Sequence, residues 1–158
     1  PYYQADLEKG AITHEKCVEM LQCLWLKITE VIKVRDDFDA QAFAGYPMWQ
    51  NCAIGGLTPD GKDGTNEFSF CCLEATFGVK STQPSLSFRY HDNVNPETFR
   101  LALSVARTGG HPAFFNDNTC ISHLLGLGFT LQEARAWGIC GCIEPIVPGK
   151  TAFQSNTG

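Results

Sequence analysis

The sequence has few of the features that mark membrane-spanning, nucleic-acid-binding or disordered proteins. Its apolar runs are short and none approaches the ~20 residues that a membrane span needs, and no basic-then-apolar signal segment opens it. Lys and Arg number 12 against 17 Asp and Glu, a net charge of −5, which argues against binding to a phosphate backbone. Apolar residues make up 44% and charged residues 18%, so a disordered chain is excluded. We expect a globular protein with no nucleic-acid or membrane partner.

Cysteine is abundant, with eight residues. A secreted disulfide framework is not favoured, because Cys17 and Cys23 fall in a helical stretch and Cys71 and Cys72 are adjacent. Zinc is not favoured either, because the chain has no Cys-x2-Cys pair and its four histidines are scattered. We therefore expect no metal site, and buried thiols in a reducing cytoplasm at every position except Cys142. The other seven are Cys17, Cys23, Cys52, Cys71, Cys72, Cys120 and Cys140.

Helical and extended patterns alternate along the chain. Apolar residues three and four apart predict a helix over 13–34 with Thr13 as its N-cap, and a polar stretch follows at 35–41. Further predicted elements are strands over 50–56, 85–90 and 113–115, helices over 66–77, 95–107, 120–125 and 130–137, and an extended or loop segment over 138–144. This alternation predicts an α/β fold with mainly parallel strands.

Several polar residues fit either a chemical or a structural role. The acidic residues of 60–67 lack the spacing of a calcium loop, and a turn followed by a helix cap explains them better. His91 and His111 fit acid/base groups, and they fit hydrogen-bonded structural histidines equally well. Arg89 follows an apolar strand pattern and fits either a carboxylate-binding residue or one half of a structural ion pair.

The segment Cys140-Gly141-Cys142-Ile143-Glu144-Pro145 carries the strongest chemical signal. Extended backbone would place Cys142 and Glu144 on one face, since residues two apart share a face, and the proline favours extended geometry before it. A carboxylate beside a thiol disfavours the thiolate. That pairing suits a thiol that donates a hydrogen atom or carries a thiyl radical, with the carboxylate as general base. A buried cysteine beside a salt-bridged glutamate is the structural alternative.

With this motif in place, the sequence resembles the glycyl radical enzyme family, which is built on the pyruvate formate-lyase-like domain. The similarity runs in family order along nearly the whole chain. It is carried by Gly55-Gly56, by the turn 60–64 with Thr65-Asn66-Glu67, by Pro84-Ser85-Leu86-Ser87-Phe88-Arg89, by Pro112-Ala113-Phe114-Phe115-Asn116-Asp117, and by Gly141-Cys142-Ile143-Glu144-Pro145.

The resemblance implies a ten-stranded α/β barrel with a cysteine loop at its centre. It implies that Cys142 is the thiyl radical carrier and Glu144 the general base, acting on a small-molecule substrate. It also implies a glycyl radical that a separate radical-SAM activating enzyme installs on a C-terminal glycine loop absent from these residues. The expected setting is an anaerobic cytoplasm, and the expected full-length protein is a homo-oligomer. Residues 1–158 are then an internal fragment of the pyruvate formate-lyase-like domain.

Departures from the family pattern reduce the number of reactions that the resemblance implies. Pyruvate formate-lyase has two adjacent cysteines in its central loop, so the sequence Cys140-Gly141-Cys142 disfavours formate C-acetyltransferase activity. The glycerol-dehydratase-like branch follows Gly-Lys-Thr with Trp-His-Asp, whereas residues 152–156 contain no carboxylate. We expect a lyase that eliminates a leaving group, most simply a dehydratase, with C–N or C–S cleavage and arylacetate decarboxylation as alternatives.

The enzyme hypothesis has a rival of another class, a non-catalytic α/β module with buried cysteines. The two differ in geometry. The enzyme predicts that Cys142 and Glu144 converge on one interior cavity, whereas the module predicts that Cys142 faces a packed apolar core.

Overall fold

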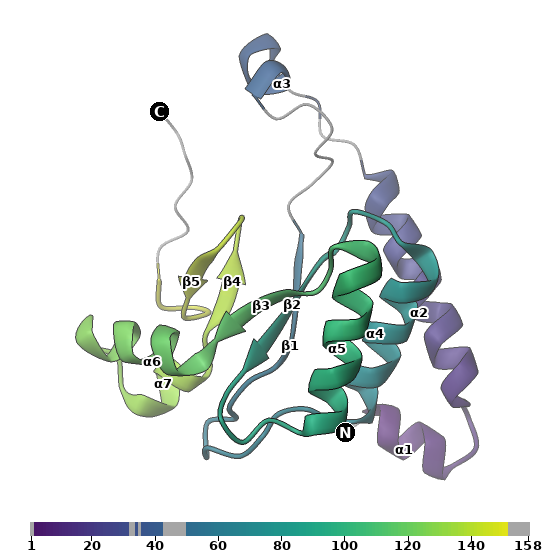
Figure 1. Ribbon diagram of the computed structural model, residues 1–158, viewed down its shortest axis with the longest axis horizontal. Coiled ribbons are helices and arrows are strands. Elements are labelled where there is room, and N and C mark those ends of the chain that lie inside the picture. Colours follow the sequence, from purple (N-terminus) through teal and green to yellow (C-terminus); the bar gives the residue numbers. More distant parts are fainter. Residues whose placement is uncertain (1, 32–33, 35, 43–49, 152–158) are drawn as a thin grey trace.

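The computed structural model of the protein describes residues 2–31, 34, 36–42 and 50–151 (Figure 1). In chain order its elements are α1 (Tyr2–Glu8), α2 (His14–Glu30), α3 (Asp37–Ala42), β1 (Asn51–Gly55), α4 (Glu67–Val79), β2 (Ser85–Tyr90), α5 (Pro96–Gly109), β3 (Ala113–Asn116), α6 (Asp117–Gly126), α7 (Leu131–Arg135), β4 (Gly138–Cys140) and β5 (Glu144–Ile146). No helix in these residues is long and apolar enough to cross a membrane.

The main sheet is parallel, as the alternating pattern predicts. Strands β1, β2 and β3 pair in that order, with Ile54 opposite Phe88 and Phe88 opposite Phe114. Helices α4 and α5 form the crossovers. Each begins at an asparagine cap, since the side chain of Asn66 accepts from Phe68 and Ser69 and that of Asn95 accepts from Glu97 and Thr98.

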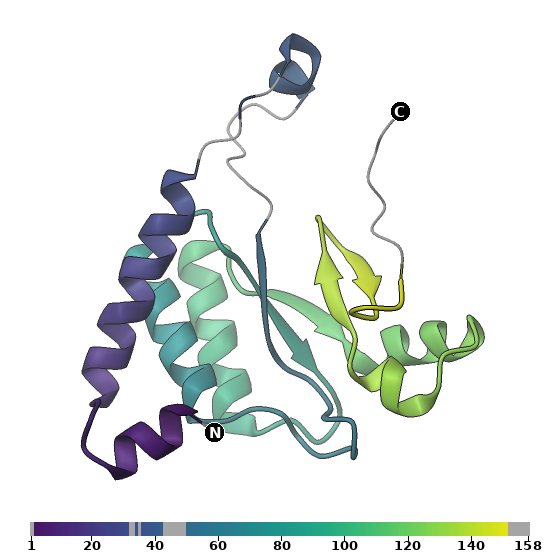
Figure 2. The ribbon, with the colours of Figure 1, turned by 180° about the vertical axis from the view of Figure 1, so that it is seen from behind.

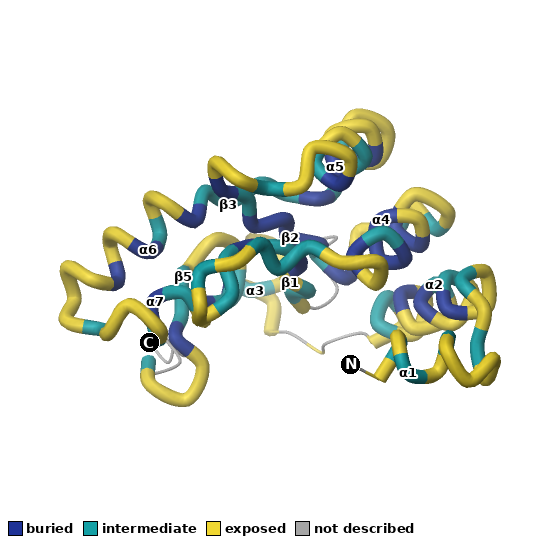
Figure 3. Tube along the Cα trace, turned by 90° about the horizontal axis from the view of Figure 1, so that it is seen from below, coloured by how far each residue is buried: buried dark blue, intermediate teal, exposed yellow. Residues whose placement is uncertain are grey.

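The molecule has three layers. Helices α4 and α5 cover one face of the sheet, and α2 packs on α4 (Figures 1 and 2). The antiparallel β4–β5 hairpin lies on the opposite side with α6 and α7 (Figure 3). Because side chains alternate along a strand, Leu86 and Phe88 reach the helical core while Ser87 and Arg89 face the hairpin.

Two hydrophobic clusters hold these layers together. The first joins the helices to the sheet, where the Phe88, Phe99 and Phe114 rings pack with centroids 5.8–6.2 Å apart. The second lies between the sheet and the hairpin and centres on Trp137, which is 2% exposed. Its other buried members are Ile121, Leu124, Ala134, Ile139 and Val147. Burying such side chains contributes roughly 1.5–3 kcal/mol for each large one.

Most element boundaries agree with the sequence prediction, and the differences have local causes. Helix α2 ends at Glu30 rather than residue 34, because Val31 turns to extended backbone (φ −73°, ψ 103°), as β-branched residues favour. Ile32, which was assigned to this helix, lies outside the described residues. Helix α6 begins at Asp117, three residues earlier than predicted, because Asn116 caps it. Helices α1 and α3 were not predicted.

Candidate active site

The motif that singles out Cys142 forms the tip of the β4–β5 hairpin. Cys140 pairs with Glu144, so residues 141–143 make the turn. Gly141 has a φ of +58°, and a Cβ added there would lie 2.8 Å from Oε2 of Glu144. A glycine is therefore required both by the backbone conformation and by the close approach of the carboxylate.

The Glu144 carboxylate folds back over the tip. Its Oε2 accepts hydrogen bonds from the backbone N–H of Cys142 at 2.8 Å and of Ile143 at 2.9 Å. Within the described residues no group donates to its other oxygen, Oε1. The N–H donors, that of Ile143 first, lower the pKa of Glu144 below its ordinary value. An ionised carboxylate with a free oxygen can accept a proton.

The exposure of the tip corrects the predicted geometry. Residues 141–143 form a turn rather than extended backbone, so Glu144 contacts the backbone amide of Cys142. Both residues are exposed in this chain, so the described residues alone do not form the interior cavity that the two side chains are predicted to line. Two hollows, of about 540 Å³ among α2, α4 and α5 and about 350 Å³ beside α1, do not include them. The packed apolar core expected of a non-catalytic module does not surround Cys142 either.

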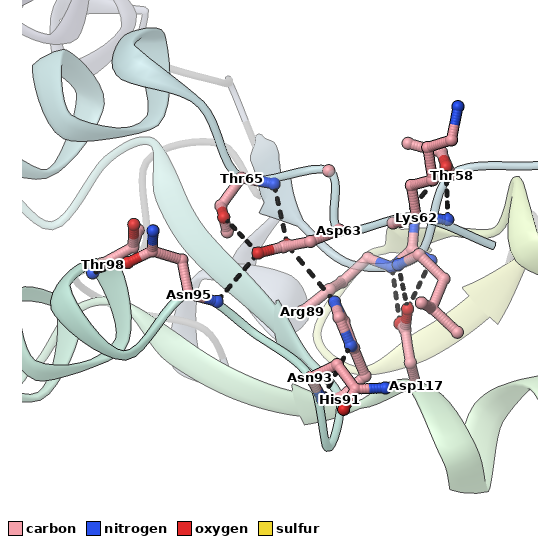
Figure 4. A network of polar contacts seen from close by, with 12 residues as sticks. Thr58, Lys62, Asp63, Thr65, Arg89, His91, Asn93, Asn95, Thr98 and Asp117 are labelled. Carbon is pink, nitrogen blue, oxygen red and sulfur yellow. Dashed lines mark hydrogen bonds and ion pairs between the residues drawn. The ribbon is translucent and has the colours of Figure 1, made fainter.

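A buried polar network lies at the base of the hairpin, between β2 and the second core (Figure 4). Arg89 donates from Nε to Oδ1 of Asp117 at 2.8 Å and from Nη2 to Oδ2 at 3.0 Å. The indole N–H of Trp137 donates to Asp117 at 2.9 Å. Arg89 also donates to the carbonyl oxygens of Trp137 and Arg135, each at 2.9 Å. Asp117 is wholly buried, and this pairing makes its burial tolerable.

Arg89 resolves one of the open alternatives. Its guanidinium lies 4.7 Å from the centre of the Trp137 ring, and the side chain is 9% exposed. Since Asp117 and two carbonyls occupy its donors, Arg89 is half of a structural ion pair and not a ligand-binding residue. A Cβ on Gly56 would lie 2.5 Å from the guanidinium carbon, so that glycine leaves room for the pair.

A second polar cluster lies beyond the end of β2 and is structural (Figure 4). His91 is buried, with Nε2 3.3 Å from Oδ1 of Asp63 and Nδ1 accepting from the N–H of Asn93. Asp63 also accepts from Thr65 and from the N–H of Asn95. Burial tends to raise the pKa of Asp63, but these donors outweigh burial and lower the pKa. The favoured alternative to a calcium loop is confirmed: a tight turn that leads into the α4 cap.

The cysteines differ in burial according to where they lie on their helices and strands. Cys17, Cys71 and Cys72 are buried between α2 and α4, as expected, and Cys72 is held protonated because burial raises its pKa. Cys52, Cys120 and Cys140 are partly buried. Cys23 is exposed, which corrects the expectation for that residue, because it lies on α2 away from the buried Cys17–Leu21–Trp25 stripe. Among the described residues no cluster of three or more His, Cys, Asp or Glu could hold a metal.

Two residues near the hairpin were missed as functional candidates. The side-chain amide of Asn51 donates to the carbonyl oxygen of Gly141 at 2.5 Å, although the two are 90 positions apart. Asp117 occurred only as the last residue of a motif that carried the family resemblance. No local pattern marks either contact.

His111 precedes β3, and within the described residues its Nδ1 has no hydrogen-bond partner.

The parallel βαβαβ unit with a glutamate-bearing cysteine hairpin against its open face matches one known family. The pyruvate formate lyase-like family model matches residues 1–158, and the chain belongs to that family. Solved members are ten-stranded α/β barrels, of which this chain corresponds to about 19%.

Individual relatives include dehydratases and lyases. The chain is 39% identical over 159 residues to "Probable dehydratase YbiW" of Escherichia coli, covering 98% of this chain and 20% of that protein. It is 34% identical to the isethionate sulfite-lyase of Bilophila wadsworthia, over 99% of this chain and 19% of that protein. A solved structure from Roseburia inulinivorans, described for 1,2-propanediol dehydration, superposes with a TM-score of 0.90 at 42% identity, over 94% of this chain and 19% of that one. The chain thus spans about a fifth of the relatives that it matches.

Proposed function

We propose that the chain is the cysteine-hairpin segment of a glycyl radical lyase, with Cys142 as the thiyl radical carrier and Glu144 as the general base. The observation that carries this proposal is the carboxylate of Glu144 bound to the backbone N–H of Cys142 at 2.8 Å. This contact fixes an ionised carboxylate two residues from an exposed thiol. A base and a hydrogen-atom acceptor at one tip can act on neighbouring atoms of one small substrate.

In the proposed reaction, Cys142 transfers a hydrogen atom and Glu144 transfers a proton. The Cys142 thiyl takes the hydrogen atom of a hydroxyl-bearing substrate carbon, which leaves S–H on the cysteine and a carbon radical on the substrate. Glu144 takes the hydroxyl proton through Oε1, and the resulting ketyl radical expels the leaving group from the adjacent carbon with its bonding electron pair. The proton on Glu144 passes to the leaving group, which regenerates the carboxylate, and the product radical recovers the hydrogen atom from the Cys142 thiol, which regenerates the thiyl radical. The net change is loss of the protonated leaving group and formation of a carbonyl.

The initiating radical belongs to a part of the protein outside this chain. A glycyl radical there would take the hydrogen atom of the Cys142 thiol, which leaves a thiyl radical on the sulfur and a C–H bond on the glycine, and the exposure of that thiol fits contact with a second loop. A radical-SAM activating enzyme installs the radical. We place the full-length protein in an anaerobic cytoplasm as a homo-oligomer, with residues 1–158 as an internal segment of its barrel.

We favour water as the leaving group, because two of the relatives reported above, at 39% and 42% identity, are described as a probable dehydratase and by 1,2-propanediol dehydration. Sulfite is the second candidate, supported by the sulfite-lyase relative at 34% identity. The residues that the family uses beyond Gly149-Lys150-Thr151 fall at 152–158, outside the described residues, so the choice of leaving group is left to experiment.

The decisive experiment uses the full-length protein, activated anaerobically by its activating enzyme. Electron paramagnetic resonance measures the glycyl radical, and turnover is measured on a panel of vicinal diols, 2-hydroxysulfonates and arylacetates. We expect Cys142→Ser and Glu144→Gln to keep the glycyl signal and lose turnover by at least ~10²-fold, since each removes one chemical step. Full turnover by Cys142→Ser would overturn the proposed function.

A further inference from the structure

We propose that Arg89, Asp117 and Asn51 are positioning residues that clamp the cysteine hairpin to the sheet at two points and thereby set where Cys142 and Glu144 lie. The inference rests on the proposed function of the hairpin. It assigns a role to residues that touch neither Cys142 nor Glu144 through their side chains.

The first clamp holds the base of the hairpin. Arg89 donates to the carbonyl oxygens of Arg135 and Trp137, the residues that lead directly into β4. Asp117 accepts from the Trp137 indole at 2.9 Å, so the same peptide segment is held through its backbone and its side chain. Because Asp117 and Trp137 are no more than 2% exposed, these bonds are shielded from competing water.

The second clamp holds the tip. The Asn51 side chain on β1 donates to the carbonyl oxygen of Gly141, the residue directly before Cys142. The same Asn51 accepts through Oδ1 a long hydrogen bond of 3.5 Å from the Ser87 hydroxyl on β2, which orients its amide. The tip is therefore tied to two strands of the sheet.

The spacing of the clamps explains why they control geometry. Trp137 and Gly141 are separated only by β4, so the strand that leads to Cys142 is fixed at both ends. Removing one clamp frees the hairpin to pivot on the other. Displacing a reacting group by about 1 Å can cost on the order of 10²-fold in rate, whereas substrate affinity depends on residues elsewhere in the barrel.

The experiment compares Asn51→Asp and Arg89→Lys with the wild type in the activated full-length enzyme. Asn51→Asp is nearly isosteric and replaces the donor with a carboxylate oxygen that repels the Gly141 carbonyl. Arg89→Lys keeps the charge but loses the planar fork that reaches several acceptors at once. His91→Gln is the matched control, because His91 follows Arg89 by two residues and contacts Asp63 and Asn93 but not the hairpin.

Three quantities are measured: the glycyl radical signal, kcat and KM separately, and amide hydrogen exchange over residues 138–146 in the unactivated protein. We expect both clamp variants to keep the radical signal, keep KM within about threefold and lose kcat by roughly 10- to 100-fold, with faster exchange in the hairpin. His91→Gln should keep kcat and hairpin exchange. If Arg89→Lys does not fold, Trp137→Phe, which removes only the indole donor, should show a smaller loss of the same kind.

Wild-type kcat and wild-type hairpin exchange in the clamp variants would overturn the inference, as would a fall in kcat without faster exchange. These outcomes are distinct from failure of the proposed function, which Cys142→Ser reports separately. Hydrogen exchange in the unactivated protein tests the clamps even if the hairpin performs another reaction.

Discussion

At the residue scale, the proposed chemistry depends on how one carboxylate, that of Glu144, is held. Glu144 uses Oε2 to stabilise the turn that carries Cys142 and leaves Oε1 for a proton. Its lowered pKa keeps it ionised at lower pH than an ordinary glutamate, so the base is available throughout the neutral range. In the proposed mechanism, structural support and chemical function are thus divided between the two oxygens of one side chain.

This division predicts the pH dependence of turnover. A base must be ionised to act, so activity falls as pH drops through the pKa of Glu144. Since that pKa lies below the ordinary 4.5, we expect kcat/KM to show no acid limb from Glu144 above about pH 5. Initial rates of the activated full-length enzyme between pH 5 and 8 measure this. An acid limb near pH 6 that Glu144→Asp shifts would contradict the assignment.

The glycine at the hairpin tip gives a second residue-scale prediction. In Gly141→Ala the new Cβ meets the Glu144 carboxylate at 2.8 Å on a backbone with a φ of +58°. The left-handed conformation alone costs roughly 1–2 kcal/mol for a non-glycine residue. We expect faster hydrogen exchange over 138–146 and at least a ~10-fold loss of kcat, since the carboxylate must move.

Gly138 provides the control for that variant. It begins the same hairpin, its φ is not positive, and nothing lies within 4 Å of an added Cβ. Gly138→Ala should therefore keep hairpin exchange and kcat near wild type. Equal losses in both variants would show that the hairpin tolerates no substitution and that the tip contact has no special role.

At the element scale, the connection between β1 and α4 is secured by one carboxylate. Asp63 accepts from Thr65 within its own turn and from the N–H of Asn95 at the start of α5. His91, at the end of β2, completes the cluster. The β1–α4 and β2–α5 connections at the carboxyl edge of the sheet therefore share one polar centre.

The lowered pKa of Asp63 makes this cluster pH-sensitive. Its stabilisation is fully present above the unfolded-state pKa of about 3.9 and is lost as pH falls through the lower folded-state pKa. We expect Asp63→Asn to lower the free energy of unfolding at pH 7 and to approach wild type below about pH 4. Urea unfolding of the full-length protein at both pH values measures this, with exposed Asp6→Asn as the control. A deficit independent of pH would mean that the amide fails to replace the carboxylate for reasons other than charge.

At the scale of the whole molecule, the described residues form an open sheet. Strands β1 and β3 are the edges of that sheet within the described residues, and unpaired strand edges promote association between chains. The helical side is well packed, whereas the hairpin side exposes Ile143 at 71%. These features fit a segment of a larger barrel.

The open edges predict the behaviour of residues 1–158 expressed alone. We expect aggregation or a broad, irreversible thermal transition, because no described strand pairs with the outer edges of β1 and β3. Circular dichroism on heating and cooling, with light scattering, measures this. A sharp and reversible transition of the isolated chain would contradict the expectation.

Local signals in the sequence determined the elements. Asn95-Pro96-Glu97 gave the start of α5, the Thr130 capping box gave α7, and the alternation at 85–90 gave β2. These predictions succeed because a cap or a period depends on residues within one or two turns. The closeness of Cys142 and Glu144 was also visible in the sequence, because the two residues are two positions apart.

Tertiary structure alone decided how that pairing is held. Arg89 and Asp117 are 28 positions apart, and Asn51 and Gly141 are 90 apart, so no local pattern encodes either contact. The register of the parallel sheet brings Arg89 to Asp117, and the seating of the hairpin on the sheet brings Asn51 to Gly141. The sequence by itself determined that Cys142 and Glu144 lie close together in the motif. The fold decided which atoms meet, because residues 141–143 form a turn rather than an extended strand and so bring the Glu144 carboxylate to the backbone N–H of Cys142.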